Sequence, residues 1–197
     1  DIVPTGSTEA AISGDVTLEG DQQYTLAAIG DGTKQPLELF ALVDDTAAPA
    51  SGAKLRIAHL APFAADLAAT KVDICTDGGD VVLGGVPYKV FTDPYLSLPA
   101  GDYNLKIALA GTDCQSVALD LPSVRLSNGE IVDVFAIGDI SNLPLQVTSI
   151  TGFSLTPAPP KTAKVNVAHF APFAGSMDGT SVSVLVNENE VFSNFMF

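Results

Sequence analysis

The stretch Lys54-Leu-Arg-Ile-Ala-His-Leu-Ala-Pro-Phe-Ala64 decides the fold of this chain, because the chain contains it twice. It returns, one domain length further on, as Lys164-Val-Asn-Val-Ala-His-Phe-Ala-Pro-Phe-Ala174, with seven of the eleven positions identical. Before the histidine, apolar and polar side chains alternate with the two-residue period of a half-buried β-strand. A repeat period this long indicates an array of whole domains rather than a solenoid of short repeats.

Further matches connect the beginning of the chain to its middle. The segments Val16–Leu18, Ile29–Asp31 and Pro36–Leu37 reappear in the same order, and at one constant offset, at Val124–Leu126, Ile137–Asp139 and Pro144–Leu145. We therefore predict five parts: the C-terminal half of a first repeat (1–46), a linker (47–53), a complete central repeat (54–150), a Pro-rich linker (151–163) and the N-terminal half of a third repeat (164–197).

The two predicted half-repeats are complementary. Asp1 aligns with about residue 109 of the central repeat and Phe197 with residue 87, so together the halves lack only counterparts of residues 88–108. The chain is then either a window on a longer array or a subunit whose half-domains pair. Such pairing could be between neighbouring copies or within one chain.

Strand and turn signals occur throughout the repeat. Alternating runs at 71–75, 103–107 and 181–186 predict strands, and the apolar run 131–137 predicts a central one. Asp77–Asp80 and Asn187–Glu190 occupy equivalent places and predict hairpin turns. About seven short strands in about 100 residues favour an all-β fold of tandem immunoglobulin-like antiparallel β-sandwich domains.

The charge balance narrows the classes of partner. Nine basic residues face 23 acidic ones, which gives a formal net charge of -14. Nucleic acids and anionic lipids attract basic surfaces, so we expect no nucleic-acid partner. No apolar run approaches the about 18–20 residues of a membrane helix, so we expect no membrane insertion within this segment. The acidity suits a protein outside the cell, with a halophilic source as the alternative.

Four of these stretches resemble one known family. They are the strand ending at His59, the loop Ala61–Ala64, the strand Val72–Gly78 and the turn and strand Leu98–Leu105. The chain is similar over essentially its whole length to tandem copies of domain of unknown function 4397, found in secreted and cell-surface proteins of bacteria and archaea. The resemblance implies repeated β-sandwich domains at the cell surface, and it implies no activity.

The repeated loop departs from the family pattern. Phe63 and Phe173 stand where the family usually has an Asp, and a longer insertion follows. If that Asp has a binding role in the family, this chain has lost it. The repeated aromatic rings could instead contact glycans or subunits, or plug a domain junction.

The candidate site residues lie mostly in this repeated loop: His59, Pro62, Phe63, His169, Pro172 and Phe173. A metal site needs three or four ligands, and neither histidine comes with a second His or a Cys pair. We therefore predict that each imidazole is partly buried and bonds the loop backbone. One metal ligand or acid–base group per domain is the alternative.

Cys75 and Cys114 are the only cysteines. They suit one disulfide in an oxidising compartment, which would close the whole segment between them into a loop, or two buried thiols in a reducing one. Their counterparts are Leu185 and about Gly6, so the pair is an optional staple and not a fixed feature of the repeat.

Catalytic and calcium-binding motifs are missing from the sequence. Asp73, Asp77 and Asp80 cluster near one predicted hairpin but do not have the spacing of an EF-hand, so we interpret them as solvated turn carboxylates. No G-x-S-x-G, H-E-x-x-H, P-loop or G-x-G-x-x-G motif occurs. We expect no enzyme, no cofactor and no metal.

The functional prediction is an extracellular structural protein, a subunit or segment of a surface stalk or fibre. Head-to-tail self-association would pack the half-repeat 164–197 against the half-repeat 1–46 of a neighbouring copy. The candidate contact residues are Val182, Val184, Val186, Val191, Phe195 and Phe197. The alternative is an adhesin that binds a glycan or a host or cell-surface protein through its Ala-Pro-Phe loops.

Overall fold

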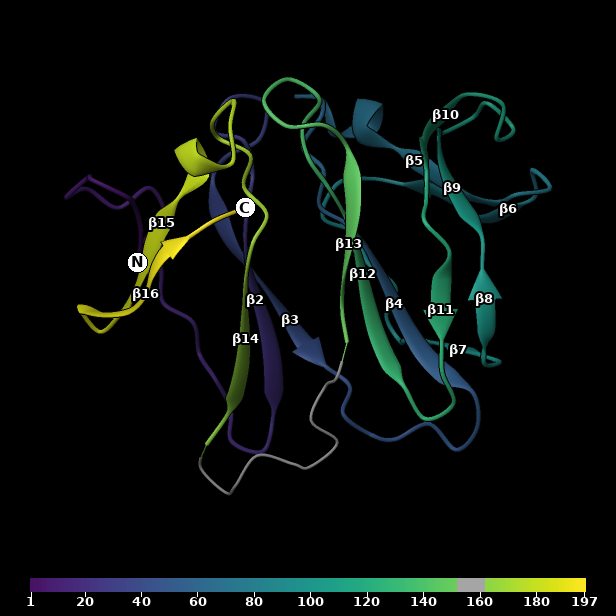
Figure 1. Ribbon diagram of the computed structural model, residues 1–197, viewed down its shortest axis with the longest axis horizontal. Coiled ribbons are helices and arrows are strands. Elements are labelled where there is room, and N and C mark those ends of the chain that lie inside the picture. The colour runs from purple at the N-terminus through teal and green to yellow at the C-terminus, as the bar shows by residue number, and fades with distance from the viewer. Residues whose placement is uncertain (152–161) are drawn as a thin grey trace. The chain divides into compact units, whose positions relative to one another are not determined.

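The computed structural model describes residues 1–151 and 162–197, and their regular structure is almost entirely β-strand (Figure 1). The all-β prediction is confirmed. Two short 3₁₀ turns, η1 (Leu67–Thr70) and η2 (Asp178–Thr180), are the only helical elements in this part of the chain. None of the described helices is long and apolar enough to cross a membrane.

The described residues divide into two compact units. The central unit contains residues 45–137 and 145–151, and the composite unit contains residues 1–44, 138–144 and 162–197. Of the predicted linker 151–163, residues 152–161 lie outside the described part of the chain.

The first sheet of the central unit has the strand order β13-β12-β4-β7. Its strands are β4 (Ala53–His59), β7 (Leu96–Leu98), β12 (Ile131–Ile137) and β13 (Gln146–Ile150). β4 and β12 run parallel to each other, with Leu55 opposite Val132, whereas the other two pairs are antiparallel. The parallel pair of β4 and β12 differs from the antiparallel pairing that the strand pattern predicts. Parallel strands need a long crossover connection, and here the rest of the repeat supplies it.

The second sheet of the central unit has the order β10-β9-β5-β6, and a two-stranded sheet β11-β8 completes the unit. The strands of the four-stranded sheet are β5 (Val72–Thr76), β6 (Val81–Val86), β9 (Leu105–Leu109) and β10 (Val117–Asp120), and those of the two-stranded sheet are β8 (Gly101–Tyr103) and β11 (Val124–Leu126). The hairpin of β5 and β6 turns at Asp77–Asp80, as predicted.

The core of the central unit lies between its two larger sheets. Ala136 of β12 packs in one cluster with Val72, Ile74 and Ile107 of the second sheet. A second cluster joins Leu55 to β11 and β12. Two facing sheets with apolar side chains between them form a β-sandwich.

The composite unit is built from both ends of the chain (Figure 1). One sheet has the order β14-β2-β3, from β2 (Gln23–Ile29), β3 (Glu38–Asp44) and β14 (Lys164–His169). The other has the order β1-β15-β16, from β1 (Ile2–Pro4), β15 (Val182–Val186) and β16 (Asn189–Phe195). β14 runs parallel to β2, just as β4 runs parallel to β12. The partner of segment 164–197 is thus segment 1–46 of the same chain.

This pairing changes the interpretation of the predicted contact strands. Val182 and Val184 are both buried, and Val182 belongs to a core cluster that contains Ile2 and Ala28, so neither side chain is available for a contact between subunits. Phe195 packs partly against the same cluster. Val186 and Val191 are exposed. Period-2 alternation marks the two faces of a strand, but it cannot tell a face buried within the chain from one buried between chains.

Candidate functional site

The repeated histidine loop has the same geometry in both units. His59 ends β4 and is buried, and its Nε2 lies 2.8 Å from the carbonyl oxygen of Thr70 at the end of η1. Its Nδ1 lies 3.4 Å from the backbone N–H of Ala61. In the composite unit, His169 makes the same two contacts, at 2.7 Å to the Thr180 carbonyl and 3.4 Å to the Ala171 N–H.

These partners assign the protonation state of each ring. A carbonyl oxygen can only accept, so Nε2 carries the proton and donates it, while Nδ1 accepts the backbone N–H. Burial lowers the pKa of His59 and of His169, and it outweighs the opposing effect of the bond to the threonine carbonyl. Both ring nitrogens are used by the backbone, so neither imidazole offers a ligand atom or a proton-transfer atom. The predicted role, in which the ring holds the loop, describes the geometry of both copies.

The aromatic rings of the loop pack against the histidines. Phe63 stacks on His59 with ring centroids 5.6 Å apart, and Phe173 stacks on His169 at 5.7 Å. Both phenylalanines are half-buried and pack against the core of their own unit. Pro62 and Pro172, which precede them, are buried. The loop therefore packs on the core of its own unit, and its aromatic rings do not form a free platform for a ligand.

A second repeated feature, Ile-Gly-Asp, organises the loop that follows β2 and the loop that follows β12. The Asp31 Oδ1 accepts backbone N–H bonds from Thr33, Lys34 and Gln35 at 2.8–3.1 Å. Burial alone would raise the pKa of Asp31, but these donors and the nearby Lys34 ammonium outweigh burial and lower it.

The counterpart Asp139 accepts from the backbone N–H groups of Asn142 and Leu143 in the same way. Sequence reasoning used both aspartates only as markers of the repeat. Their recurrence after a strand and a glycine was the available signal for a loop-closing carboxylate.

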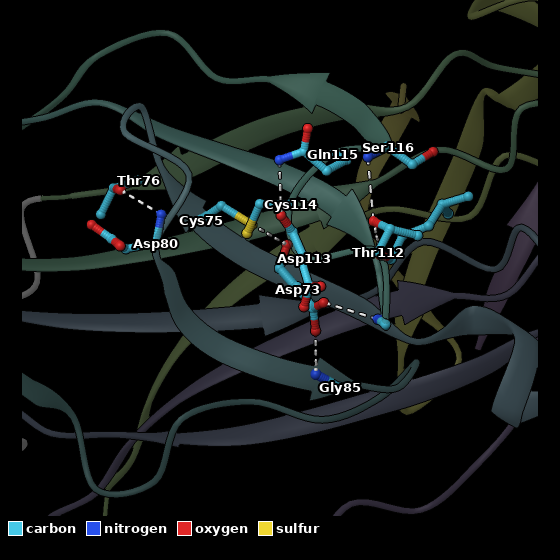
Figure 2. Close-up of a disulfide and its surroundings, with 12 residues drawn as sticks. Asp73, Cys75, Thr76, Asp80, Gly85, Thr112, Asp113, Cys114, Gln115 and Ser116 are labelled. Carbon is cyan, nitrogen blue, oxygen red and sulfur yellow. Dashed lines mark hydrogen bonds between the residues drawn. A yellow bond between two sulfur atoms is a disulfide. The ribbon is translucent and has the colours of Figure 1, made fainter.

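Cys75 and Cys114 form a disulfide in the central unit, with Cα atoms 6.1 Å apart (Figure 2). The bridge ties β5 to the loop between β9 and β10. Asp73, two residues before Cys75, is buried and accepts from the backbone N–H groups of Gly85 and Gly111 at 2.7 and 3.1 Å. Disulfide and carboxylate together hold the same loop against β5.

The three aspartates that were considered for calcium have separate roles. Asp73 bonds the backbone, Asp77 lies 3.3 Å from the ammonium of Lys106, and Asp80 is exposed. Within residues 1–151 and 162–197, no group of three or more His, Cys, Asp or Glu side chains could hold a metal ion. Asp77 and Asp80 are exposed turn residues, as predicted, whereas Asp73 is buried in β5, so the prediction of a solvated turn carboxylate is wrong for that residue.

A buried ion pair that the sequence analysis missed lies between the two parallel strands of the central unit. Arg56 of β4 and Asp133 of β12 occupy opposite positions, and the Arg56 Nη2 donates to the Asp133 Oδ2. The Arg56 guanidinium also lies 4.9 Å from the centroid of the Tyr95 ring. Arg56 alternates with Leu55 and Ile57, so the period-2 pattern had assigned it to the solvent.

The described chain is thus an all-β protein of two units, each built around the same strand, histidine and loop. It belongs to the family described as Domain of unknown function (DUF4397), whose model matches residues 2–70 and 65–180. The two adjacent matches are consistent with tandem repeats of the domain and confirm the resemblance given above. Comparison with curated proteins gave no match, and comparison with solved structures gave none either.

Proposed function

We propose that this chain is an extracellular structural protein, a segment of a surface stalk or fibre built from tandem β-sandwich domains. The observation that carries the proposal is the use of the repeated residues. His59 and His169 are buried and bond their own backbone, and Asp31 and Asp139 close their own loops. The repeated histidines and aspartates therefore serve to hold the fold of each unit, and this is the use expected of repeated residues in a structural protein.

The strand pairing supports a mechanical role. In the composite unit, residues 164–169 pair with residues 23–28 and residues 182–184 pair with residues 2–4. A force applied to the two ends of the chain would act on strands of the composite unit. There, the rows of backbone hydrogen bonds along each strand pair would resist their separation. In the central unit the disulfide adds a covalent tie.

The disulfide and the acidity favour a place outside the cell. Disulfides persist in oxidising compartments and are rare in the cytosol of most organisms. A formal net charge of -14 keeps exposed fibres dispersed and discourages binding to anionic surfaces. Both features suit a cell-surface location.

The adhesin alternative depends on exposed aromatic loops. Because Phe63 and Phe173 stack on buried histidines and contact the core of their own unit, their packing weighs against a glycan platform. The proposal contains no catalytic step, since both imidazoles already bond the backbone.

The test combines electron microscopy of the native material with a measurement of its intact mass under non-reducing and under reducing denaturation. We expect either filaments that dissociate into chains of 20.3 kDa or a longer covalent array that survives reduction. Protease treatment of intact cells should remove the protein. A single dispersed chain of that mass that assembles into nothing, or one protected inside intact cells, would contradict the proposal.

A further inference from the structure

The two Ile-Gly-Asp loops of the chain meet within the composite unit. The loop after β2 (residues 30–35) and the loop after β12 (residues 138–144) both belong to this unit. Asp31 and Asp139 each close their own loop by accepting backbone N–H bonds on one carboxylate oxygen, Oδ1. The other carboxylate oxygen of each, Oδ2, is left for a different partner.

These two Oδ2 atoms both lie beside the same ammonium group. The Lys34 Nζ is 3.5 Å from the Asp31 Oδ2 and 3.5 Å from the Asp139 Oδ2. It also donates to the Ser141 hydroxyl at 2.6 Å and to the Asp139 carbonyl oxygen at 3.0 Å. Four oxygen atoms from two loops therefore converge on one nitrogen, and two of the four come from carboxylates.

The charges at this place do not balance. The side chains of Asp31 and Asp139 are 1% and 0% exposed, and that of Lys34 is 23% exposed. Two negative charges that share one buried place repel each other strongly, because little water screens them. A single ammonium neutralises only one of the two. A cation with two positive charges would match the pair of carboxylates better.

The Asp31 Oδ2 is the oxygen that Lys34 satisfies least. It is buried, and it accepts no hydrogen bond from the described residues. Its ion pair with Lys34, at 3.5 Å, is longer than a charge-assisted hydrogen bond of about 2.7–2.9 Å. A buried acceptor without a hydrogen bond is costly, so this atom points to a ligand that the ammonium replaces incompletely.

The counterpart of Lys34 in the repeat is Asn142, three residues after Asp139. The Asn142 Nδ2 donates to the Asp139 Oδ2 and to the Pro172 carbonyl oxygen, both at 2.9 Å. A neutral side chain therefore suffices at this position of the loop. The backbone bonds to the aspartate, and not the lysine charge, are the feature that both loops share.

We propose that the four oxygens form a calcium-type cation site, and that the Lys34 ammonium occupies this site as a tethered substitute for the ion. Carboxylate and carbonyl oxygens are the ligands that Ca²⁺ takes in proteins, and waters complete its coordination to six to eight oxygens. The two carboxylates would balance the charge of one divalent ion. The composite unit is thus independent of calcium while Lys34 is present, and it becomes a calcium-binding unit when the ammonium is removed.

The geometry favours Ca²⁺ over Mg²⁺. The four oxygens lie at uneven distances from the Lys34 nitrogen, from 2.6 to 3.5 Å. Ca²⁺ accepts irregular arrangements at about 2.3–2.6 Å, whereas Mg²⁺ demands a nearly ideal octahedron at about 2.0–2.1 Å. The two loops would have to move less to bind the larger ion.

The test is Lys34→Ala, freed of metal with EDTA and titrated with calcium chloride by calorimetry. We expect one-to-one binding with a Kd of about 1 mM or tighter, and binding of magnesium chloride at least about tenfold weaker. Calcium at about ten times the Kd should raise the unfolding temperature of the variant by about 5 °C or more. The wild type should show neither effect.

Three control variants separate the proposed site from general attraction of cations to an acidic chain. Lys34→Arg keeps the positive charge and should not bind Ca²⁺. Adding Asp31→Asn to Lys34→Ala should weaken the binding by about tenfold or more. Lys54→Ala removes an ammonium that bonds one carboxylate, that of Asp45 at 2.5 Å, and one carbonyl oxygen, that of Ala47 at 2.8 Å. It should create no site, because the second carboxylate is missing there.

Several results would overturn the proposal. They are Ca²⁺ binding to the wild type as tight as to Lys34→Ala, equal binding by Lys54→Ala, and binding that Asp31→Asn does not weaken. If Lys34→Ala is unfolded in EDTA, Ca²⁺ should restore the circular dichroism spectrum of the wild type, and failure to restore it would overturn the proposal as well. None of these measurements depends on filament formation, so the fibre role is tested separately.

Discussion

Arg56 and Asp133 lie opposite each other on the parallel strands β4 and β12, and both are almost completely buried. The composite unit has a different pair at the equivalent place, where Asn166 lies opposite Thr25. There the Thr25 hydroxyl donates to Asp44 at 3.0 Å, and the Asn166 amide approaches both. Both parallel pairs thus carry a buried polar group at the same register, but only one of them is an ion pair.

The ion pair predicts an asymmetric mutational response. Asp133→Asn removes the negative charge opposite the buried Arg56 guanidinium and should cost about 3–5 kcal/mol of unfolding free energy. The double variant Arg56→Met with Asp133→Leu removes both charges and should regain most of that loss. Urea unfolding measures both. A double variant as unstable as the single one would contradict this explanation, because it would mean that the ion pair itself stabilises the fold and that the loss does not come from one uncompensated buried charge.

The buried histidines predict that stability falls in mild acid. The folded-state pKa of His59 and of His169 lies below the ordinary value of 6.5, so the unfolded chain binds more protons between the two values. Their contribution is complete above pH 6.5 and is lost as the pH falls from 6.5 toward the lowered folded-state pKa. Urea unfolding at pH 7.5, 6.5 and 5.5 should therefore give decreasing free energies.

The matched control for this pH dependence is His59→Gln with His169→Gln. The glutamine amide can still donate to the threonine carbonyl, but it does not titrate, so the profile should flatten above pH 5. The lowered pKa values of Asp31 and Asp45 act below their ordinary value of 3.8, outside this window. A flat profile for the wild type would contradict the neutral ring geometry.

The disulfide predicts a local loss of stability. Replacing Cys75 and Cys114 with serine opens a loop closed across a sequence separation of 39 and should cost about 4 kcal/mol in the chain-entropy model. Leu185 replaces Cys75 in the composite unit, so that unit serves as the internal control. Calorimetry should find the transition of the central unit lowered and that of the composite unit unchanged. Equal shifts in both would show that the two units unfold together.

Alanine substitutions at two glycines with the same backbone angle distinguish the cost of steric overlap from the cost of backbone strain. Gly30 and Gly79 both have φ of +91°, but a Cβ at Gly30 would overlap the Pro36 carbonyl oxygen, while a Cβ at Gly79 meets nothing. Gly79→Ala should cost about 1–2 kcal/mol for the left-handed conformation alone. Gly30→Ala adds the overlap and should cost at least about 2 kcal/mol more. Equal losses in thermal unfolding would contradict the close approach.

The candidate site was partly predictable from sequence. The recurrence of the histidine with Ala-Pro-Phe located the loop, and the lack of accompanying ligands indicated a structural imidazole. The partner of each ring, the carbonyl of Thr70 or Thr180, comes from a residue 11 positions further along, in a 3₁₀ turn that has no sequence pattern of its own. Arg56 was missed because a charge on a strand is normally solvated, and only the opposing Asp133 allows it to be buried.

The sequence by itself determined several of the strands, such as those at 54–59, 71–75 and 131–137, together with the hairpin turns, the repeat and the two cysteines that could pair, because each is encoded by residues close together in the chain or by direct recurrence. Only the tertiary structure decided which strands meet. Ile57 pairs with Val134, and Val167 pairs with Leu26 from the other end of the chain. Neither pairing leaves a local signal, since its free energy comes from core burial and backbone bonds that exist only after the intervening chain has closed.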